Sequence, residues 1–340
     1  LLSAVLFGIS PVLLKATVGE ISPVLAAGLL YLGSGIGLLL FSIAQRKSIT
    51  NELSKLPTSA RFKLGGAVFT GGIAAPILLL YGLRLATAFE VSLLLNLEAV
   101  ATTVLAAWIF HEHVGRRVWL GKILIVAGAV IVSLQSGAAI MTFSLPALFI
   151  LGACILWGID NNLTRDVEEL SPATLACIKG LVAGIFNVSL ALTFGQAIPS
   201  IQQISTTLGI GAICYGTTLV FFVMALRQIG TSRTGTYFAT GPFIGMICAV
   251  LFLSERPHGY QWISALLMAA GAWILAREFH QHVHTHEATT HRHSHTHDEH
   301  HQHRHKDSEA TEVPHEHEHT HNVLTHEHAH LPDIHHRHRH

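Results

Sequence analysis

The chain has 340 residues, of which half are hydrophobic and 12% are charged, and its formal net charge at pH 7 is zero. So few charged residues exclude an ordinary soluble domain, which carries about a quarter charged residues, and the zero net charge without a basic stripe excludes a nucleic-acid binder. Of the 26 histidines, 23 lie from His280 onward, so the sequence predicts a polytopic membrane protein with a soluble, histidine-rich tail.

Ten apolar runs approach the length of roughly 20 residues that a helix needs to cross the hydrocarbon core of a bilayer. In chain order they cover 1–18, 22–44, 64–83, 87–110, 118–136, 143–160, 172–194, 207–227, 233–254 and 260–277. The predicted fold class is therefore an all-α membrane protein with ten transmembrane helices.

Lysine and arginine in the short loops predict the orientation, because cytoplasmic loops carry an excess of both. If the N-terminus is cytoplasmic, the connections on the other side of the membrane have only Lys15, Arg84 and Arg256 at their edges. The cytoplasmic loops then contain Arg46, Lys47, Lys55, Arg61, Lys63, Arg116, Arg117, Arg165, Arg227, Arg233 and Arg277. The sequence therefore predicts a multi-pass protein of the cytoplasmic membrane with both termini in the cytoplasm.

Short segments of the first half recur in order in the second half. Leu6-Phe7-Gly8-Ile9 is echoed by Leu156-Trp157-Gly158-Ile159, and at a separation of 143 residues Glu112 and Trp119 match Glu255 and Trp262. Each repeat (1–136 and 143–277) has five predicted spans, an odd number, so the second repeat is expected to lie upside down relative to the first. Inverted repeats let many secondary transporters form two related states around a site near the midplane.

Two stretches carry a family resemblance. Asn96-Leu97-Glu98 through Phe110-His111-Glu112 and Ala127-Gly128 resembles the end of an EamA domain, and Gly241-Pro242 through Leu253-Ser254-Glu255 resembles a second one. Two tandem domains of this kind are similar to the drug/metabolite transporter superfamily. The resemblance implies a ten-helix bundle that moves small metabolites by alternating access, often as an exporter. The second repeat has Gly241 where the first has Glu98, so a charge-dependent role of Glu98 belongs to one half only.

Ionisable side chains at membrane depth are costly and are usually functional. Glu98 lies near the centre of the fourth predicted span and Lys179 about two turns into the seventh, so the pair is expected to face one another across a cavity and to bind a polar or zwitterionic substrate. Alternatively, Glu98 takes up a proton for antiport, or the two residues form a structural ion pair. Asn96 and Asn187 lie near the same depths and complete the predicted substrate site, unless they only join helices.

Residues 278–340 have almost no hydrophobic content and are expected to be disordered. Histidines alternate with other residues, and neutral imidazole is a good ligand for nickel, zinc and cobalt. The predicted metal ligands are His282, His284, His286, His291, His293, His295, His297, His315, His317, His319, His321, His326, His328 and His330. The alternatives are a low-complexity spacer and a polycation that forms on mild acidification.

The leading hypothesis is a secondary transporter, an exporter of a small metabolite, with a metal-binding regulatory or buffering tail. In the alternatives, nickel, cobalt, zinc or a metal complex is itself the cargo, or the protein is a membrane scaffold that concentrates metal without transport. An enzyme is not expected, because the sequence has no P-loop and no nucleophile–base arrangement; no cofactor is required beyond the tail metals. The expected partners are the small-molecule substrate, the lipid bilayer, metal ions and, as an open alternative, a second copy of the chain in a homodimer.

Overall fold

The computed structural model divides the chain into two units, Leu1–Glu278 and Phe279–His340, which are described separately. The residues described are 1–17, 21–46, 48–109, 114–134, 144–165, 167, 169–276, 280–286, 289–295, 315–321 and 324–330. For 109, 226–233, 235, 236, 276 and the segments of the second unit, the description is limited to the backbone. The residues from the sequence analysis that lie outside these ranges are Lys47, Phe110, His111, Glu112, Arg277 and His297.

The first half of the helical unit begins with two long helices and a short one. Ser22 caps the second of them by accepting a hydrogen bond from the Leu25 N–H at 3.3 Å, and Pro23 occupies the first helical position, where its missing N–H has no cost. The elements are α1 (Leu2–Thr17), α2 (Pro23–Ala44), α3 (Ile49–Ser54), α4 (Thr58–Ala67), η1 (Val68–Ala74), α5 (Ala75–Leu85), α6 (Ala88–Leu94), α7 (Leu97–Ile109) and α8 (Arg116–Ser133).

The second half repeats this plan from α9 onward. Ser171 and Pro172 begin α10 as Ser22 and Pro23 begin α2, with the Ser171 hydroxyl accepting from the Thr174 N–H at 3.3 Å. The elements are α9 (Leu145–Arg165), α10 (Pro172–Thr193), α11 (Ile201–Ile210), η2 (Gly211–Thr217), α12 (Thr218–Phe238), α13 (Gly241–Leu253) and α14 (Gly259–Ala276).

Two irregularities of the backbone recur at matching places in the two halves. The π-helical segments η1 and η2 begin at Val68 and Gly211, 143 residues apart, and end at Ala74 and Thr217, again 143 residues apart. A short helix break also recurs further along each half, at 95–96 between α6 and α7 and at 239–240 between α12 and α13. The repeat seen in the sequence therefore extends to the hydrogen-bonding register of the backbone.

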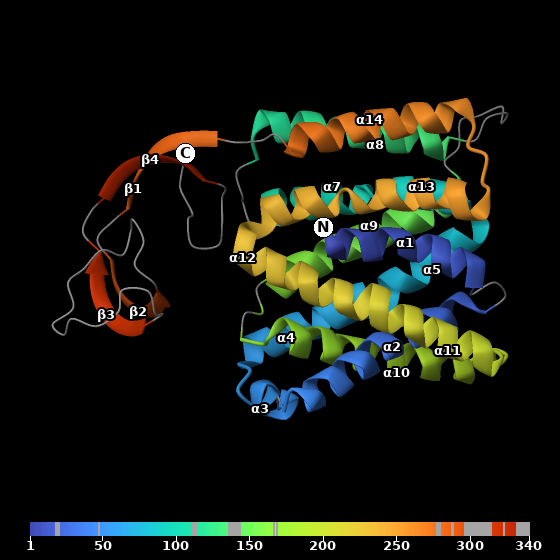
Figure 1. The fold of residues 1–340 in the computed structure, drawn as a ribbon, viewed down its shortest axis with the longest axis horizontal. Helices are drawn as coiled ribbons and strands as arrows, with labels where there is room; N and C mark the ends of the chain where they lie inside the picture. Colours follow the sequence, from blue (N-terminus) through green and yellow to red (C-terminus); the bar gives the residue numbers. More distant parts are fainter. Residues whose placement is uncertain are drawn as a thin grey trace. The chain divides into compact units, whose positions relative to one another are not determined.

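The two halves are interlocked rather than side by side. Helix α2 packs against α10, α8 against α14, α1 against α13 and α7 against α9, and each pair joins one helix from either half (Figure 1). At the α1–α13 contact the backbones approach so closely that a Cβ atom on Gly8 would overlap the carbonyl group of Gly241. Small residues permit such close approach between helices in a membrane.

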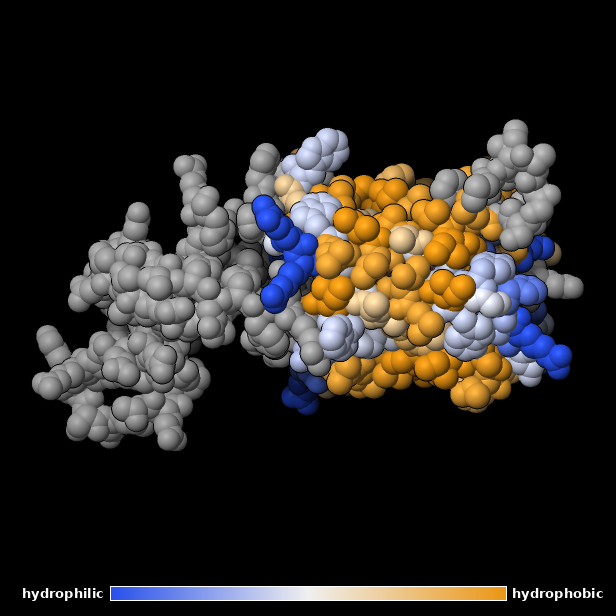
Figure 2. Space-filling view, turned by 90° about the horizontal axis from the view of Figure 1, so that it is seen from above, coloured by the Kyte–Doolittle hydropathy of each residue, from blue (hydrophilic) through white to orange (hydrophobic). Residues whose placement is uncertain are grey.

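The surface of the helical unit is apolar around its middle and hydrophilic at its two ends on the face drawn in Figure 2. Large side chains such as Phe62 and Trp108 are 79% and 80% exposed, and an exposed apolar surface of this extent marks contact with a membrane or partner. Within the part of the chain that the structure describes, six helical stretches are long and apolar enough to cross a membrane, among them Pro23–Ala44, Ala88–Trp108 and Pro172–Thr193. Leu2–Thr17, Gly241–Leu253 and Gly259–Leu275 are apolar but shorter.

Each of the ten predicted spans overlaps a helical stretch of the structure, which confirms the prediction of a mostly helical protein. Not all of these stretches meet the length and hydropathy expected of a crossing helix. Helix α8 carries Arg116, Arg117 and Lys122 among its 18 residues and is not among the six. The number of membrane crossings therefore remains a prediction.

In the second unit the structure describes paired strands where the sequence analysis expected disorder. Strand β1 (His280–His286) pairs with β4 (Leu324–His330), and β2 (Thr289–His295) pairs with β3 (His315–His321), both antiparallel. Strict alternation of residue types has the period of a strand, which fits these four segments, and the disorder of the tail as a whole stays a prediction. Two-stranded pairs are at best marginally stable in water, so they do not by themselves make a packed domain.

Candidate functional site

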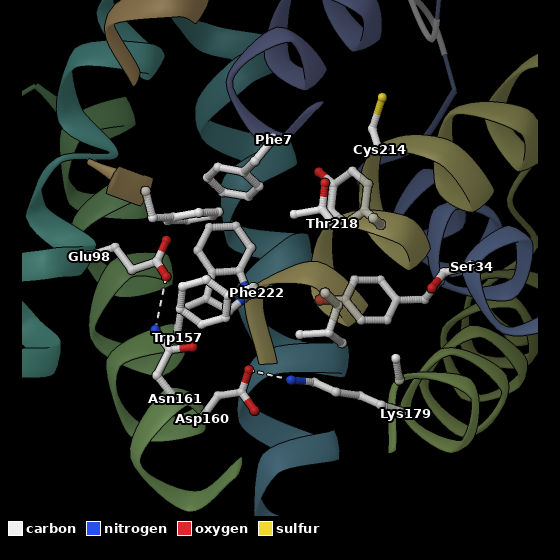
Figure 3. A pocket seen from close by; sticks show the side chains of 15 residues that line it. Phe7, Ser34, Glu98, Trp157, Asp160, Asn161, Lys179, Cys214, Thr218 and Phe222 are labelled. Carbon is white, nitrogen blue, oxygen red and sulfur yellow. Dashed lines mark hydrogen bonds and ion pairs between the residues drawn. The ribbon is translucent and has the colours of Figure 1, made fainter. Parts of the chain in front are cut away.

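A cavity in the helical unit gathers polar and aromatic side chains from both halves of the chain (Figure 3). Its charged lining residues are Glu98 from α7, Asp160 from α9 and Lys179 from α10. The other lining residues are Phe7, Tyr31, Ser34, Trp157, Asn161, Ala176, Cys214, Tyr215, Thr218, Leu219, Phe222 and Phe238. Both halves contribute, so a change in the packing of one half against the other would change the cavity.

Asp160 and Lys179 form a buried ion pair at one side of the cavity. The Lys179 ammonium donates a hydrogen bond to Oδ2 of Asp160, and the two side chains are only 2% and 5% exposed for Lys179 and Asp160, respectively. The Thr164 hydroxyl, one helical turn further along α9, donates to the other carboxylate oxygen at 3.0 Å. Buried charges persist only when they are paired and hydrogen-bonded in this way.

The π-helical segment η1 shapes the space around this pair. A Cβ atom on Gly71 would overlap the Asp160 carboxylate, so the absence of a side chain there makes room for the acid. The Gly71 carbonyl oxygen also accepts hydrogen bonds from the Tyr31 hydroxyl and from the Trp157 indole N–H, the latter at 3.1 Å. Single-turn π segments of this kind occur frequently at functional sites.

Glu98 lies at the start of α7 and lines the same cavity. Its Oε1 accepts a hydrogen bond at 2.9 Å from the side-chain amide of Asn161, which also donates to the Thr102 hydroxyl at 3.3 Å. Among the residues whose side chains the structure describes, no ion pair involves Glu98. The carboxylate therefore has a neutral hydrogen-bond donor as its partner and no cation.

Aromatic rings form much of the remaining wall. The ring of Phe7 is 5.9 Å from that of Trp157 in an edge-to-face arrangement and 5.0 Å from that of Phe238, and Phe222 is 4.7 Å from Phe238. Tyr31 and Tyr215 lie 5.9 Å apart between their ring centroids. These centroid distances fall in the range of favourable ring contacts, so the rings form a connected apolar wall.

The structure brings together two of the four predicted site residues. Glu98 and Lys179 line the same cavity, but the direct partner of Lys179 is Asp160, which corrects the expectation that Glu98 and Lys179 pair with each other. Asn96 and Asn187 do not line the cavity. Asn96 donates to the Leu93 carbonyl at 2.9 Å, and the fully buried Asn187 donates to the carbonyls of Gly72 and Ile73 at 3.5 and 3.4 Å, so both join backbone segments instead.

Asp160 and Asn161 line the cavity but are not among the four predicted substrate-site residues. The predicted span ends at 160, which puts Asp160 at a helix end. The helix continues to Arg165, which places Asp160 more than one turn inside α9. The available signal was the pairing of this acid with Lys179, the other charged residue at comparable depth.

One end of the bundle is held by a clamp at the turn between α5 and α6. The Lys15 ammonium donates to the carbonyls of Leu83 and Ala86 at 2.7 and 2.6 Å, and the Glu255 carboxylate accepts from the N–H groups of Ala88 and Phe89 at 2.9 and 2.8 Å. A cation at the end of one helix and an anion at the start of the next both complement the helix dipoles. Lys15 and Glu255 are called the α5–α6 clamp below.

A second clamp lies at the other end of the bundle. Gly82, near the end of α5, lies against Ile150 and the Pro146 carbonyl at the start of α9. The start of α9 is therefore at the same end of the bundle as the α5–α6 clamp. The end of α9 and the start of α10 are at the opposite end of the bundle. There the Glu52 carboxylate of α3 accepts from the N–H of Ser171 at 2.8 Å and from its hydroxyl at 3.2 Å. Glu52 is called the α10 clamp below.

Comparison with known proteins relates both halves of the helical unit to one family. The profile of the EamA-like transporter family matches residues 1–134 and again residues 144–277. An uncharacterized transporter of Methanothermobacter thermautotrophicus is 26% identical over 289 residues, which cover 80% of this chain and 83% of that protein. An uncharacterized transporter of Synechocystis sp. is 22% identical over 291 residues, covering 79% and 86% of the two chains.

A solved crystal structure shares the fold. It superimposes with a TM-score of 0.59 at 17% sequence identity and covers 80% of this chain and 96% of its own. At this level of identity the likeness concerns the arrangement of helices only.

Proposed function

Because the chain belongs to the EamA-like transporter family, we propose that this membrane transporter moves a small organic metabolite by alternating access, with the cavity around Glu98, Asp160 and Lys179 as its substrate site. Membership confirms the resemblance to two tandem EamA domains. The observation that carries the proposal is a buried cavity with three charged side chains and an aromatic wall, built from both repeats. Charged groups at membrane depth usually mark a transport pathway.

The way the two halves meet supports the proposal of alternating access. The α5–α6 clamp and the α10 clamp hold opposite ends of the same bundle, and each consists of a few hydrogen bonds at helix ends. Releasing one clamp while the other holds would open the cavity to one side only. Rocking of two related halves around a fixed site is the usual mode of such transporters. The direction that we propose is export, as the family resemblance implies.

The experiment that tests transport is a flux screen with the full chain reconstituted in lipid vesicles. Vesicles loaded with a mixture of small metabolites are incubated with and without nickel, zinc and cobalt outside. We expect loss of at least one organic metabolite faster than from empty vesicles. No flux of any metabolite or metal above that of empty vesicles would refute the proposal.

We propose ten membrane crossings with both termini in the cytoplasm, as the loop charges predict. Reporter fusions after Arg61 and after Arg277 should therefore both read cytoplasmic, while a fusion near Gly137 should read external. The control is a fusion at the far C-terminus, which must agree with the one after Arg277. An external reading at the C-terminus would contradict the ten-span arrangement.

We also propose that the tail binds transition metals through its alternating histidines and so buffers or senses metal supply. A peptide of residues 280–340 should bind several Ni²⁺ or Zn²⁺ ions at neutral pH. Binding should fade below about pH 6, because imidazole has an ordinary pKa of ~6.5 and its protonated form cannot donate a lone pair to a metal. Calorimetric titration measures the number of ions bound and their affinity. The control is a peptide with every histidine replaced by asparagine. If the unaltered peptide binds no metal at neutral pH, the tail is only a spacer.

Metal as the cargo is the second candidate, favoured by the density of histidines in the tail. Among the side chains that the structure describes, no group of three or more His, Cys, Asp and Glu residues could hold a metal ion. The cavity offers two carboxylates, of which Asp160 is already bound by Lys179. An organic substrate therefore fits the cavity better than a bare ion. Truncation of the chain after Phe279 separates the two candidates, because the flux of metal falls in the truncated protein only if the tail delivers metal as cargo.

A further inference from the structure

The described charged residues that line the cavity are two acids and one base, so their charges do not cancel. Asp160 and Lys179 neutralise each other in a direct ion pair. Glu98, the third charged residue of the lining, is held by the neutral amide of Asn161, and among the side chains described no cation pairs with it. Among the lining side chains that the structure describes, the ionised groups thus sum to one unit of negative charge, located at Glu98.

An unpaired carboxylate in a buried cavity is unfavourable, because the charge has lost its hydration. A counter-charge close to the carboxylate offsets this cost. A substrate that brings a positive charge to Glu98 would relieve this cost. A substrate with a negative charge would need Lys179, and Lys179 is already bound to Asp160. A zwitterion would need both Glu98 and a free Lys179, so it too would have to separate the buried pair.

The side chains around Glu98 indicate the chemistry of the uncharged part of the substrate. Phe7 and Trp157 are buried and in edge-to-face contact, and the rings of Phe222 and Phe238 continue the same wall. Glu98 points into the same cavity as Phe7 and Phe222 (Figure 3). Aromatic faces attract cations and also pack against flat apolar groups.

We propose that the transported substrate is an organic cation: an amine whose ammonium group binds the Glu98 carboxylate and whose ring-bearing apolar body packs against the aromatic wall. This inference rests on the proposed function, because it names the substrate class of the same cavity. Asn161 then acts as a positioning residue that fixes the orientation of the carboxylate. The Asp160–Lys179 pair stays closed while the substrate binds.

The test uses three probes that share a phenyl ring and differ in charge: phenethylamine (cation), phenylalanine (zwitterion) and phenylacetate (anion). Their dissociation constants are measured by calorimetry on the purified full chain in detergent. We expect phenethylamine to bind on the order of 30-fold more tightly than phenylacetate, the size of effect expected when a buried charge gains or lacks its partner. Glu98→Gln should weaken phenethylamine binding by a similar factor.

The matched control is Glu90→Gln, which removes a carboxylate from α6 that does not line the cavity, and it should leave phenethylamine binding unchanged. If Glu98→Gln does not fold, the ranking of the three probes on the unaltered chain decides. Tighter binding of phenylacetate or phenylalanine than of phenethylamine, or no binding of any probe, would overturn the cation assignment.

Flux measured on the same protein separates this inference from the proposed function. Transport of a metabolite that is not a cation, unaffected by Glu98→Gln, would leave the transporter proposal intact and refute the cation. Tight binding of phenethylamine without any flux above empty vesicles would support the cation site and refute transport.

Discussion

Replacing Asp160 with asparagine is expected to lower the free energy of unfolding by about 3 to 5 kcal/mol, because it leaves the Lys179 ammonium buried without its counter-charge. Asparagine has nearly the same shape and can still accept the Thr164 hydrogen bond, so the loss arises from charge and not from packing. Thermal or denaturant unfolding of the purified protein in detergent measures the effect. The exposed carboxylate of Glu169 provides the control, since Glu169→Gln should change stability little.

A double variant distinguishes the ion pair from other causes of destabilisation. Combining Asp160→Asn with Lys179→Met removes both charges and keeps a side chain of similar length at 179. This variant should recover most of the lost stability, because replacing a buried pair by neutral groups is often close to neutral in free energy. A single Asp160→Asn variant as stable as the unaltered protein would mean that water in the cavity solvates Lys179.

Replacing Glu98 with glutamine should reduce transport to the level of empty vesicles while the protein remains inserted and folded. Glutamine keeps the shape of the side chain and an oxygen that can accept the Asn161 hydrogen bond, but it removes the one charge of the cavity without a cationic partner among the described side chains. Flux of the substrate found in the vesicle screen measures the loss, and the unfolding temperature verifies the fold.

Glu90→Gln is the matched control for transport as well, because Glu90 lies in the helix that precedes α7 and does not line the cavity. It should carry substrate at the unaltered rate. Full transport by the Glu98→Gln variant would show that the carboxylate is incidental, and that the cavity acts through the Asp160–Lys179 pair or through its aromatic wall alone.

Much of the helical unit could be predicted from hydropathy, because a helix that crosses a lipid bilayer requires a long apolar run, and such runs can be read directly from the sequence. The depth of Glu98 and Lys179 followed from the same runs. Their partners did not, since the rotation of each helix about its axis depends on packing against its neighbours. Hydropathy alone thus predicts a depth for Lys179 without revealing that Lys179 pairs with Asp160.

The features that lay beyond the sequence are those of local backbone geometry. The extension of α9 past Asp160-Asn161-Asn162 contradicts the polar character of that run, which is stabilised by contacts such as Asn161 with Glu98. The π-helical segments η1 and η2 have the same apolar composition as ordinary helix. In the second unit, the alternation of histidine with other residues fits a strand, whereas the low hydrophobicity favours disorder. The two signals conflict, so the sequence alone does not determine the conformation there.

The contact of Gly8 with Gly241 limits how similar the two halves can be in sequence. Gly241 occupies the position that corresponds to Glu98, and a Cβ atom there would already lie 2.7 Å from the Ala4 carbonyl oxygen. A glutamate could not be restored at 241 without separating α1 from α13. A protein with two identical halves, each bringing its own acid, is therefore sterically incompatible with this packing, and on the proposed function Glu98 alone would serve both states of the transporter.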